Sequence, residues 1–236
     1  MSSESTPHSQ FALLKTRRFA PFFVTQFLGA FNDNLFKNAL VVLLTFHAAS
    51  WTTLAPEVLT NLAAGIFIVP FFLFSATAGQ LADKYDKSKL ARLVKVLEML
   101  IMGVAALGFF MHSLTVLLGA LFLLGLHSTL FGPVKYAILP QHLREDELVG
   151  GNALVETGTF VAILVGTLAG GLLAGAAGHP SWVAFAGLLV AAAGFLASFG
   201  IPAAPPLVPG LAVNLNPVSE TWRNIGFARQ NRTVFL

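Results

Sequence analysis

The chain has 236 residues, of which 56% are hydrophobic and only 11% are charged, and its mean hydropathy is +0.75. A soluble domain carries about a quarter charged residues and cannot enclose this much apolar surface in one core, so the composition excludes a soluble globular protein and indicates an integral membrane protein. The formal net charge of +3 is explained below by membrane orientation, and it does not require nucleic acid as a partner.

Six segments are apolar enough to cross the hydrocarbon layer, which takes a helix of about 20 residues. We place them at residues 19–46, 58–82, 90–111, 113–139, 148–177 and 181–201. The sequence therefore predicts an all-α polytopic membrane protein with six transmembrane helices. It divides into a cytoplasmic N-terminal tail (1–18), the bundle (19–201), a cytoplasmic proline-rich linker (202–228) and the start of a truncated seventh helix (229–236).

Basic residues gather on one side of this predicted topology. Three precede the first helix, five lie at or just after the second connection, one lies in the fourth, and three follow the sixth helix: Lys15, Arg17, Arg18, Lys84, Lys87, Lys89, Arg92, Lys95, Arg144, Arg223, Arg229 and Arg232. The connections on the opposite side contain none. The positive-inside rule then places the N-terminus and both ends of the bundle in the cytoplasm.

The first predicted helix carries a polar stripe. At 100° per residue, Gln26, Asp33 and Lys37 fall within about 40° of one another, and Asn34 and Asn38 form an adjoining strip. One ionised residue at the centre of a spanning helix costs about 2.5–3.5 kcal/mol. An internal Asp33–Lys37 pair is one interpretation. It leaves the neighbouring amides unexplained, whereas a helix that faces a hydrated cavity accounts for them.

The connection after the second helix reads "GQLADKYDKSK". We expect a closely packed Gly79, a carboxylate at Asp83 that holds a neighbouring helix N-terminus or Arg, and cationic side chains at the membrane surface; a solvated turn is the alternative. The stretch resembles the major facilitator superfamily pattern G-x-x-x-D-[RK]-x-G-[RK]-[RK]. Gly79, Asp83, Lys84 and Lys87 match it, whereas Asp86 occupies the second glycine position.

Helices four and five carry further intramembrane charges. Lys135 follows Gly132-Pro133, a pair that loosens a helix. Asn152 and Glu156 lie one turn apart early in helix five. Because a short connection makes these helices antiparallel, we expect Lys135 and Glu156 to meet, either as part of a cavity or as a structural ion pair without a substrate role.

Glycines at 166, 170, 171 and 175 give helix five two small-xxx-small spacings. Such spacings let helix backbones approach closely. The same smooth surface could let two halves of a transporter slide during its cycle.

Other chemistry is not indicated. We expect Arg92 and Lys95 to satisfy Glu98 by snorkelling. Cysteine is absent and the six histidines (His8, His47, His112, His127, His142 and His179) are scattered, so no metal site is predicted. No nucleotide-binding loop occurs, so neither a cofactor nor ATP is expected. No histidine has Asp five residues on, so we predict no catalytic residues and no enzyme activity in these residues.

Four stretches, "FLGAFNDN", "GQLADKYDKSK", "FGPVKYAILPQ" and "LVGGNALVETGTFVAILVGTLAGG", together resemble the bacterial lysophospholipid transporter family, especially the version fused to an acyltransferase and an acyl-carrier-protein ligase. The resemblance implies transport of lysophospholipids, chiefly lysophosphatidylethanolamine, from the outer to the inner leaflet of the bacterial inner membrane for reacylation. Asp33, Asn34, Lys135, Asn152 and Glu156 match family motif positions. Lys37 is found mainly in the fused version.

The resemblance implies that the chain is the N-terminal six-helix half of such a transporter, with the C-terminal half, the lipid bilayer and a fused or associated acyltransferase as partners. The candidate substrate-binding residues are Gln26, Asp33, Asn34, Lys37, Lys135, Asn152 and Glu156, and the candidate conformational residues are Gly79, Asp83, Lys84 and Lys87. Two other interpretations stay open: a membrane anchor that delivers substrate to the acyltransferase, and a facilitator for a small polar solute.

Overall fold

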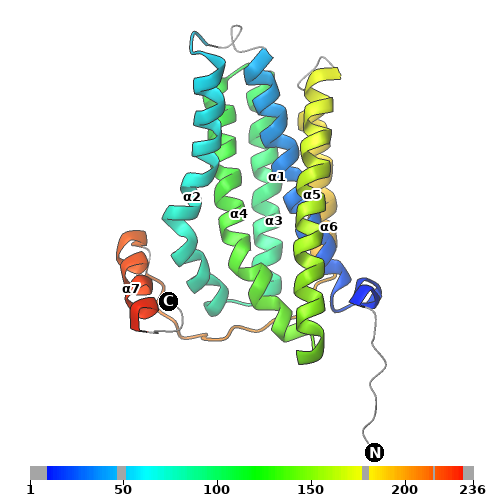
Figure 1. Cartoon of the computed structure of the whole chain (residues 1–236), viewed down its shortest axis with the longest axis vertical. Helices are drawn as coiled ribbons and strands as arrows, with labels where there is room; N and C mark the ends of the chain where they lie inside the picture. The colour runs from blue at the N-terminus through cyan, green and yellow to red at the C-terminus, as the bar shows by residue number, and fades with distance from the viewer. Residues whose placement is uncertain (1–9, 47–51, 177–180, 215, 231–236) are drawn as a thin grey trace, which may run out of the picture.

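The computed structural model of the chain describes residues 10–46, 52–176, 181–214 and 216–230, and these are helical or irregular, with no strand among them. Figure 1 shows the long helices side by side along the long axis of the molecule. They are α1 (Ala20–Phe46), α2 (Pro56–Lys84), α3 (Lys87–Phe110), α4 (Leu114–His142), α5 (Leu148–Ala176) and α6 (Ser181–Ser198). Two short 3-10 helices, η1 (Gln10–Lys15) and η3 (Glu145–Glu147), and the helix α7 (Pro217–Gln230) complete the described elements.

The six predicted helices correspond to α1–α6, with ends that differ by a few residues. Five of them, α2–α6, are long and apolar enough to cross a membrane. α1 has the length but is not among these five, because its polar stripe lowers its mean hydropathy. Large side chains such as Phe72, Phe110 and Phe160 are mostly exposed and suit contact with acyl chains. The chain is therefore a multi-pass membrane protein.

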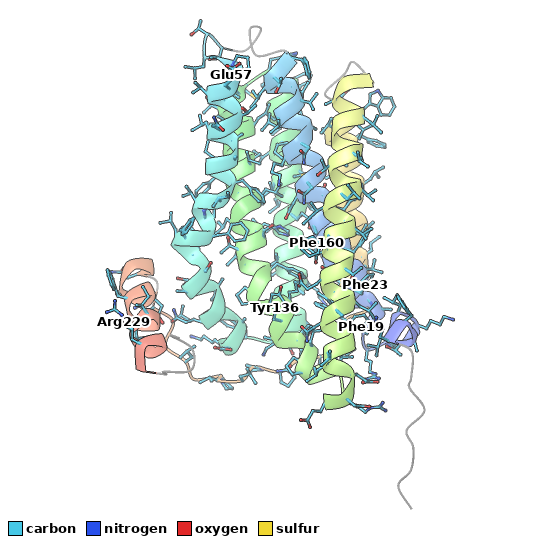
Figure 2. The ribbon with its side chains drawn as sticks, in the orientation of Figure 1. Phe19, Phe23, Glu57, Tyr136, Phe160 and Arg229 are labelled. Atoms are coloured by element: carbon cyan, nitrogen blue, oxygen red, sulfur yellow. The ribbon has the colours of Figure 1, made fainter. Side chains whose placement is uncertain are left out.

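Charged and polar residues mark the two ends of the bundle. Glu57 lies at one end of α2, whereas Arg229 of α7 lies toward the opposite end, as Figure 2 shows. We call the latter the basic end, because it also carries the lysine-rich α2–α3 connection. There Asp86 caps α3, since its carboxylate accepts hydrogen bonds from the backbone N–H groups of Ser88 at 2.8 Å and Lys89 at 3.2 Å.

Close backbone approach decides which helices are neighbours. α1 packs most extensively against α5, and α2 against α4. A Cβ added at Gly166 or Gly170 would lie 2.4 Å from the carbonyl oxygen of Phe31 or 2.2 Å from that of Leu35. A Cβ at Gly171 or Gly175 would meet nothing within 4 Å. Gly166 and Gly170 thus form the surface of α5 that packs against α1, whereas Gly171 and Gly175 do not contribute to it.

Two apolar clusters fill the bundle. One lies away from the basic end and includes Leu40, Leu44 and Leu121. The other lies near the basic end and includes Phe22 and Ile138. The polar middle of α1 lies between them.

The proline-rich segment after α6 is held against the basic end, and we call residues 202–214 the strap. The backbone oxygen of Asp83 accepts hydrogen bonds from the N–H groups of Leu207 at 3.0 Å and Val208 at 2.9 Å. The ammonium group of Lys87 donates to the carbonyl of Pro205 at 3.1 Å, and Gln141 of α4 donates to the same oxygen at 3.2 Å. The strap therefore joins the ends of α2, α3 and α4.

α7 follows the strap and packs against α2 (Figure 1). It occupies Pro217–Gln230, within the stretch interpreted from the sequence as a linker up to residue 228. Of the expected start of a seventh helix at 229–236, the first two residues belong to the end of α7, and 231–236 lie outside the described residues.

Candidate functional site

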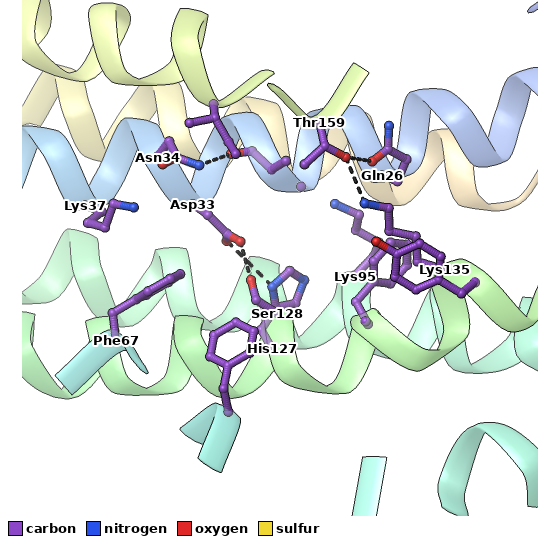
Figure 3. A pocket seen from close by; sticks show the side chains of 17 residues that line it. Gln26, Asp33, Asn34, Lys37, Phe67, Lys95, His127, Ser128, Lys135 and Thr159 are labelled. Atoms are coloured by element: carbon purple, nitrogen blue, oxygen red, sulfur yellow. Dashed lines mark hydrogen bonds and ion pairs between the residues drawn. The ribbon is translucent and has the colours of Figure 1, made fainter. Parts of the chain in front are cut away.

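The polar face of α1 lines an open cavity of about 450 Å³, to which α2, α4 and α5 also contribute, with one lysine from α3. Its polar lining consists of Gln26, Asp33, Asn34, Lys37, Lys95, His127, Ser128, Lys135, Tyr136 and Thr159. Phe67, Phe71 and Phe131 are aromatic neighbours within the same cavity. Figure 3 shows these side chains converging from several helices. The cavity interpretation of the polar stripe therefore agrees with the structure.

Asp33 faces α4. The hydroxyl of Ser128 donates a hydrogen bond to its carboxylate, and Nδ1 of His127 lies 3.7 Å from its Oδ1. Asp33 and Lys37 do not form an ion pair at contact distance, because Lys37 turns toward α2 instead. There its ammonium nitrogen lies 5.0 Å from the centroid of the Phe67 ring, an electrostatic contact with the π face.

A second charged group, which includes Lys95 of the cavity lining, is almost fully buried. Nζ of Lys95 is 2.5 Å from Oε2 of Glu98, and the two side chains are 1% and 0% exposed. The amide of Asn32 donates to Glu98 at 2.7 Å, and Nε2 of His127 lies 3.3 Å from the same carboxylate.

We expected Glu98 to be satisfied near the surface by snorkelling. Lys95 is confirmed as its partner, but Arg92 donates to backbone oxygens of Ser198 and Ile201 instead. The pair does not snorkel to the surface, because packing of α3 against α4 and α6 encloses it.

Two glycines make room for the Lys95 side chain. A Cβ at Gly29 of α1 would lie 2.9 Å from its Nζ, and one at Gly194 of α6 would lie 3.0 Å away. The ammonium group therefore passes between two helix backbones that have no side chain at this level. Sequence reasoning did not select Lys95, Glu98 or His127 for the site, although Lys95 and Glu98 have the i, i+3 spacing of a helical ion pair.

Lys135 and Glu156 meet across α4 and α5, as expected. Nζ of Lys135 lies 3.1 Å from Oε1 of Glu156 and donates to the hydroxyl oxygen of Thr159 at 2.9 Å. Tyr136 also donates to Glu156, at 2.7 Å. The Glu156 side chain is 43% exposed, so the pair lies at the rim of the cavity. Thr159 in turn donates to the side-chain oxygen of Gln26 at 3.0 Å.

Three amides are satisfied largely by the helices that carry them. Asn152 donates to the backbone oxygen of Leu148 at 2.8 Å and does not line the cavity. Asn34 lines the cavity but donates to the backbone of Ala30 at 2.8 Å. Asn38 donates to the backbone of Asn34 and, at 3.0 Å, to Thr167 of α5. Asn152 and Glu156 are the two candidate binding residues that are not part of the cavity lining.

The candidate conformational residues lie together at the basic end. Lys87 is fully buried beneath the strap, so the alternative interpretation of a solvated turn is wrong at this position. Lys84 lies over the ring of Tyr85 with its nitrogen 5.6 Å from the centroid. The expected close packing of Gly79 is wrong within the described chain, since a Cβ there would meet no heavy atom within 4 Å. A role of Asp83 and its neighbours in conformational change stays a prediction.

No cluster of three or more His, Asp or Glu side chains suited to a metal ion occurs in the parts of the chain that the structure describes. The cavity contains instead a carboxylate, ammonium groups, amides and aromatic rings. Such a lining can hold a polar, charged organic group next to an apolar one.

A bundle of membrane-spanning helices around an internal cavity with charges of both signs is the architecture of a polytopic membrane transporter. The family model for the Major Facilitator Superfamily matches residues 22–234, and the chain belongs to this superfamily.

The chain is similar to proteins named Lysophospholipid transporter LplT. It is 30% identical to the one from Enterobacter sp. (strain 638) over 203 residues, which are 84% of this chain and 47% of that protein. It is 32% identical to the one from Escherichia coli (strain SE11) over 213 residues, 85% of this chain and 49% of that protein. The chain thus spans about half the length of the curated relatives it matches.

Proposed function

We propose that the protein containing this chain moves lysophospholipids, chiefly lysophosphatidylethanolamine, from the outer to the inner leaflet of a bacterial inner membrane for reacylation. The observation that carries the proposal is the position of Asp33: an acidic side chain on a membrane helix that lines a cavity holding both lysines and phenylalanines. The names of the relatives support the same substrate class. Acyl transfer itself belongs to a separate or fused acyltransferase.

The chemistry of the cavity suits a lysophospholipid. Moving a zwitterionic head through hydrocarbon would strip its hydration, and the cavity offers replacement partners. Asp33 attracts the ethanolamine ammonium, and Lys37 or Lys135 meets the phosphate through charge-assisted hydrogen bonds. Gln26 and Asn34 supply neighbouring amide groups. The single acyl chain lies along Phe67, Phe71 and Phe131.

The orientation follows from the basic residues. The basic end, with the N-terminus, faces the cytoplasm. Half of a facilitator cannot alternate access alone, so we propose that a second six-helix bundle, of the kind that the length of the relatives allows for, closes the cavity from the other side. Asp83 and its neighbours at the α2–α3 connection then contact that bundle during the cycle.

The test uses the product of the complete gene in vesicles of phosphatidylethanolamine and phosphatidylglycerol, with labelled lysophosphatidylethanolamine. Asp33→Asn removes the charge without changing size, and we expect it to abolish transfer while membrane insertion persists. Asp146→Asn, at an exposed acid between α4 and α5, is the matched control and should transport normally. Wild-type transfer by Asp33→Asn would refute the role of Asp33. Absence of transfer by the unaltered protein would support the anchor interpretation.

A further inference from the structure

We propose that the head-group phosphate occupies two successive positions in the cavity, first beside Lys37 and then beside Lys135, while the ammonium group stays near Asp33. This inference rests on the proposed transport of lysophospholipids. It adds an order of events and gives the two lysines different roles.

Lys37 has no direct ion-pair partner in the described chain, and Asp33, one turn earlier on the same helix, acts on it only at longer range. Lys37 lines the cavity, and no carboxylate among the described residues lies within ion-pair distance of it. Its ammonium nitrogen lies 5.0 Å from the centroid of the Phe67 ring. An ammonium group held at membrane depth without a direct ion pair is unfavourable, so this position favours an incoming anion. A phosphate that enters the cavity supplies that charge.

Lys135 is paired, but its partner is solvated. Glu156 is 43% exposed and lies at the rim, so the 3.1 Å pair is of the weak, screened kind. A phosphate can replace the carboxylate at Lys135 while Tyr136 keeps its hydrogen bond to Glu156. When the phosphate leaves, Glu156 pairs with Lys135 again and restores the unoccupied arrangement.

Lys95 is excluded as a third position. Its nitrogen is 2.5 Å from Glu98, and both side chains are sealed from solvent. A phosphate there would compete with a fully enclosed carboxylate. Breaking such a pair costs far more than displacing one at a rim.

The two available lysines lie on opposite sides of Asp33 along the bundle axis, as Figure 3 shows. Lys37 follows Asp33 by four residues, about 6 Å along a helix. Lys135 lies near the level of Gln26, because both contact Thr159, and Gln26 precedes Asp33 by seven residues, about 10 Å. With the basic end in the cytoplasm, Lys37 is on the outer-leaflet side and Lys135 on the cytoplasmic side.

The ethanolamine arm is only two carbons long, so its ammonium and phosphate reach neighbouring partners at the same time. With the ammonium at Asp33, the phosphate points to Lys37 when the head enters and to Lys135 when it has turned. The head group thus reverses its direction inside the cavity, which is the reversal that transfer between leaflets requires.

The experiment compares Lys37→Gln and Lys135→Gln in right-side-out vesicles, with initial transfer rates measured against the concentration of lysophosphatidylethanolamine. Loss of a charge-assisted contact at the entry site should raise KM about 10-fold for Lys37→Gln, with maximal rate retained. Lys135→Gln should instead lower the maximal rate about 10-fold with little change in KM, because loading at Lys37 persists. Lys37→Arg keeps the positive charge and should raise KM less than Lys37→Gln does, and Lys89→Gln on the exposed side of α3 is the matched control that should transport normally.

Equal changes of the same kinetic parameter in both variants would overturn the two-position order, as would wild-type kinetics in both. Either result leaves transport itself intact, whereas no transfer by the unaltered protein would overturn the proposed function. Thermal unfolding of each variant in detergent separates misfolding from a kinetic effect. If Lys37→Gln unfolds early, Lys37→Met with Lys37→Arg as reference gives the same comparison of KM.

Discussion

Nε2 of His127 on α4 lies 3.3 Å from Oε2 of Glu98 on α3, in the interior of a membrane protein. The other nitrogen of the same imidazole lies 3.7 Å from Asp33, the acid that lines the cavity. One imidazole thus lies between the acid that lines the cavity and a fully buried carboxylate. The enclosed pair of Lys95 and Glu98 is therefore part of the surroundings that hold Asp33 in place.

The first prediction concerns this enclosed pair. Lys95→Met leaves the Glu98 carboxylate buried without a cation and should lower the free energy of unfolding by about 3–5 kcal/mol. The double variant Lys95→Met/Glu98→Gln leaves neither charge behind and should recover most of the loss. Thermal unfolding in detergent measures both, with Lys89→Met on the exposed side of α3 as control. An unchanged unfolding temperature in Lys95→Met would contradict the pair's structural role.

A second prediction follows from the contact between α1 and α5. Gly170→Ala places a methyl group 2.2 Å from the carbonyl oxygen of Leu35, so the helices must separate, and stability should fall by about 1–3 kcal/mol. Gly171→Ala, at the adjacent residue with nothing within 4 Å, should fold as well as the wild type. Unfolding in detergent again gives the comparison. Equal stability of the two variants would mean that α1 and α5 are not in backbone contact here.

The third prediction concerns the cap of α3, outside the spanning helices. Partial burial raises the pKa of Asp86, but hydrogen bonds from the Ser88 hydroxyl and from the backbone amides of Ser88, Lys89 and Ala204 outweigh it and hold the pKa below its ordinary value. Because the folded pKa is the lower one, the cap contributes fully above the ordinary aspartate pKa of about 3.9 and is lost as pH falls through the folded value.

Asp86→Ala should therefore cost about 1 kcal/mol near neutral pH and less in acid. Asp86→Asn keeps a capping oxygen but does not titrate, so its stability should lack this acid dependence. Unfolding measured from neutral to strongly acid pH distinguishes the three proteins. The same acid dependence in Asp86→Asn as in the wild type would assign it to another group.

A fourth prediction separates a structural ion pair from a transport role at the cavity rim. Lys135→Glu and Glu156→Lys each remove the pair, and the double exchange restores opposite charges across α4 and α5. Because the exchange leaves a carboxylate where we place the phosphate, we expect the double variant to fold but not to transport. Labelled lysophosphatidylethanolamine in vesicles provides the measurement. Restored transfer would favour a purely structural pair.

Much of the fold was accessible from the sequence because each helix contributes a long apolar run, and the limits of α5 agree with the prediction to within one residue. The polar stripe of α1 could also be predicted, since Gln26, Asp33 and Lys37 have a helical spacing that places them on one face. The Lys135–Glu156 contact followed from the short, antiparallel connection of α4 and α5.

The rest of the site depends on how helices pack. The residues next to Glu98 in the sequence do not indicate that α4 and α6 enclose it. From the sequence, Lys95 could therefore be expected to extend to the membrane surface. His127 is a lone histidine in an apolar run, and only the approach of α1 and α3 makes it a bridge. Asn152 matched the pattern of a binding residue, yet its amide bonds to its own helix.

The strap has a mechanical consequence for any rearrangement of the bundle. Gln80 and Asp83 of α2, Lys87 of α3 and Gln141 of α4 all bond to the same short stretch of backbone. If one of these helices tilted at the basic end independently of the other two, it would have to give up hydrogen bonds. The ends of α2, α3 and α4 should consequently move together as one rigid body. Conformational change in this protein then takes place elsewhere along the helices.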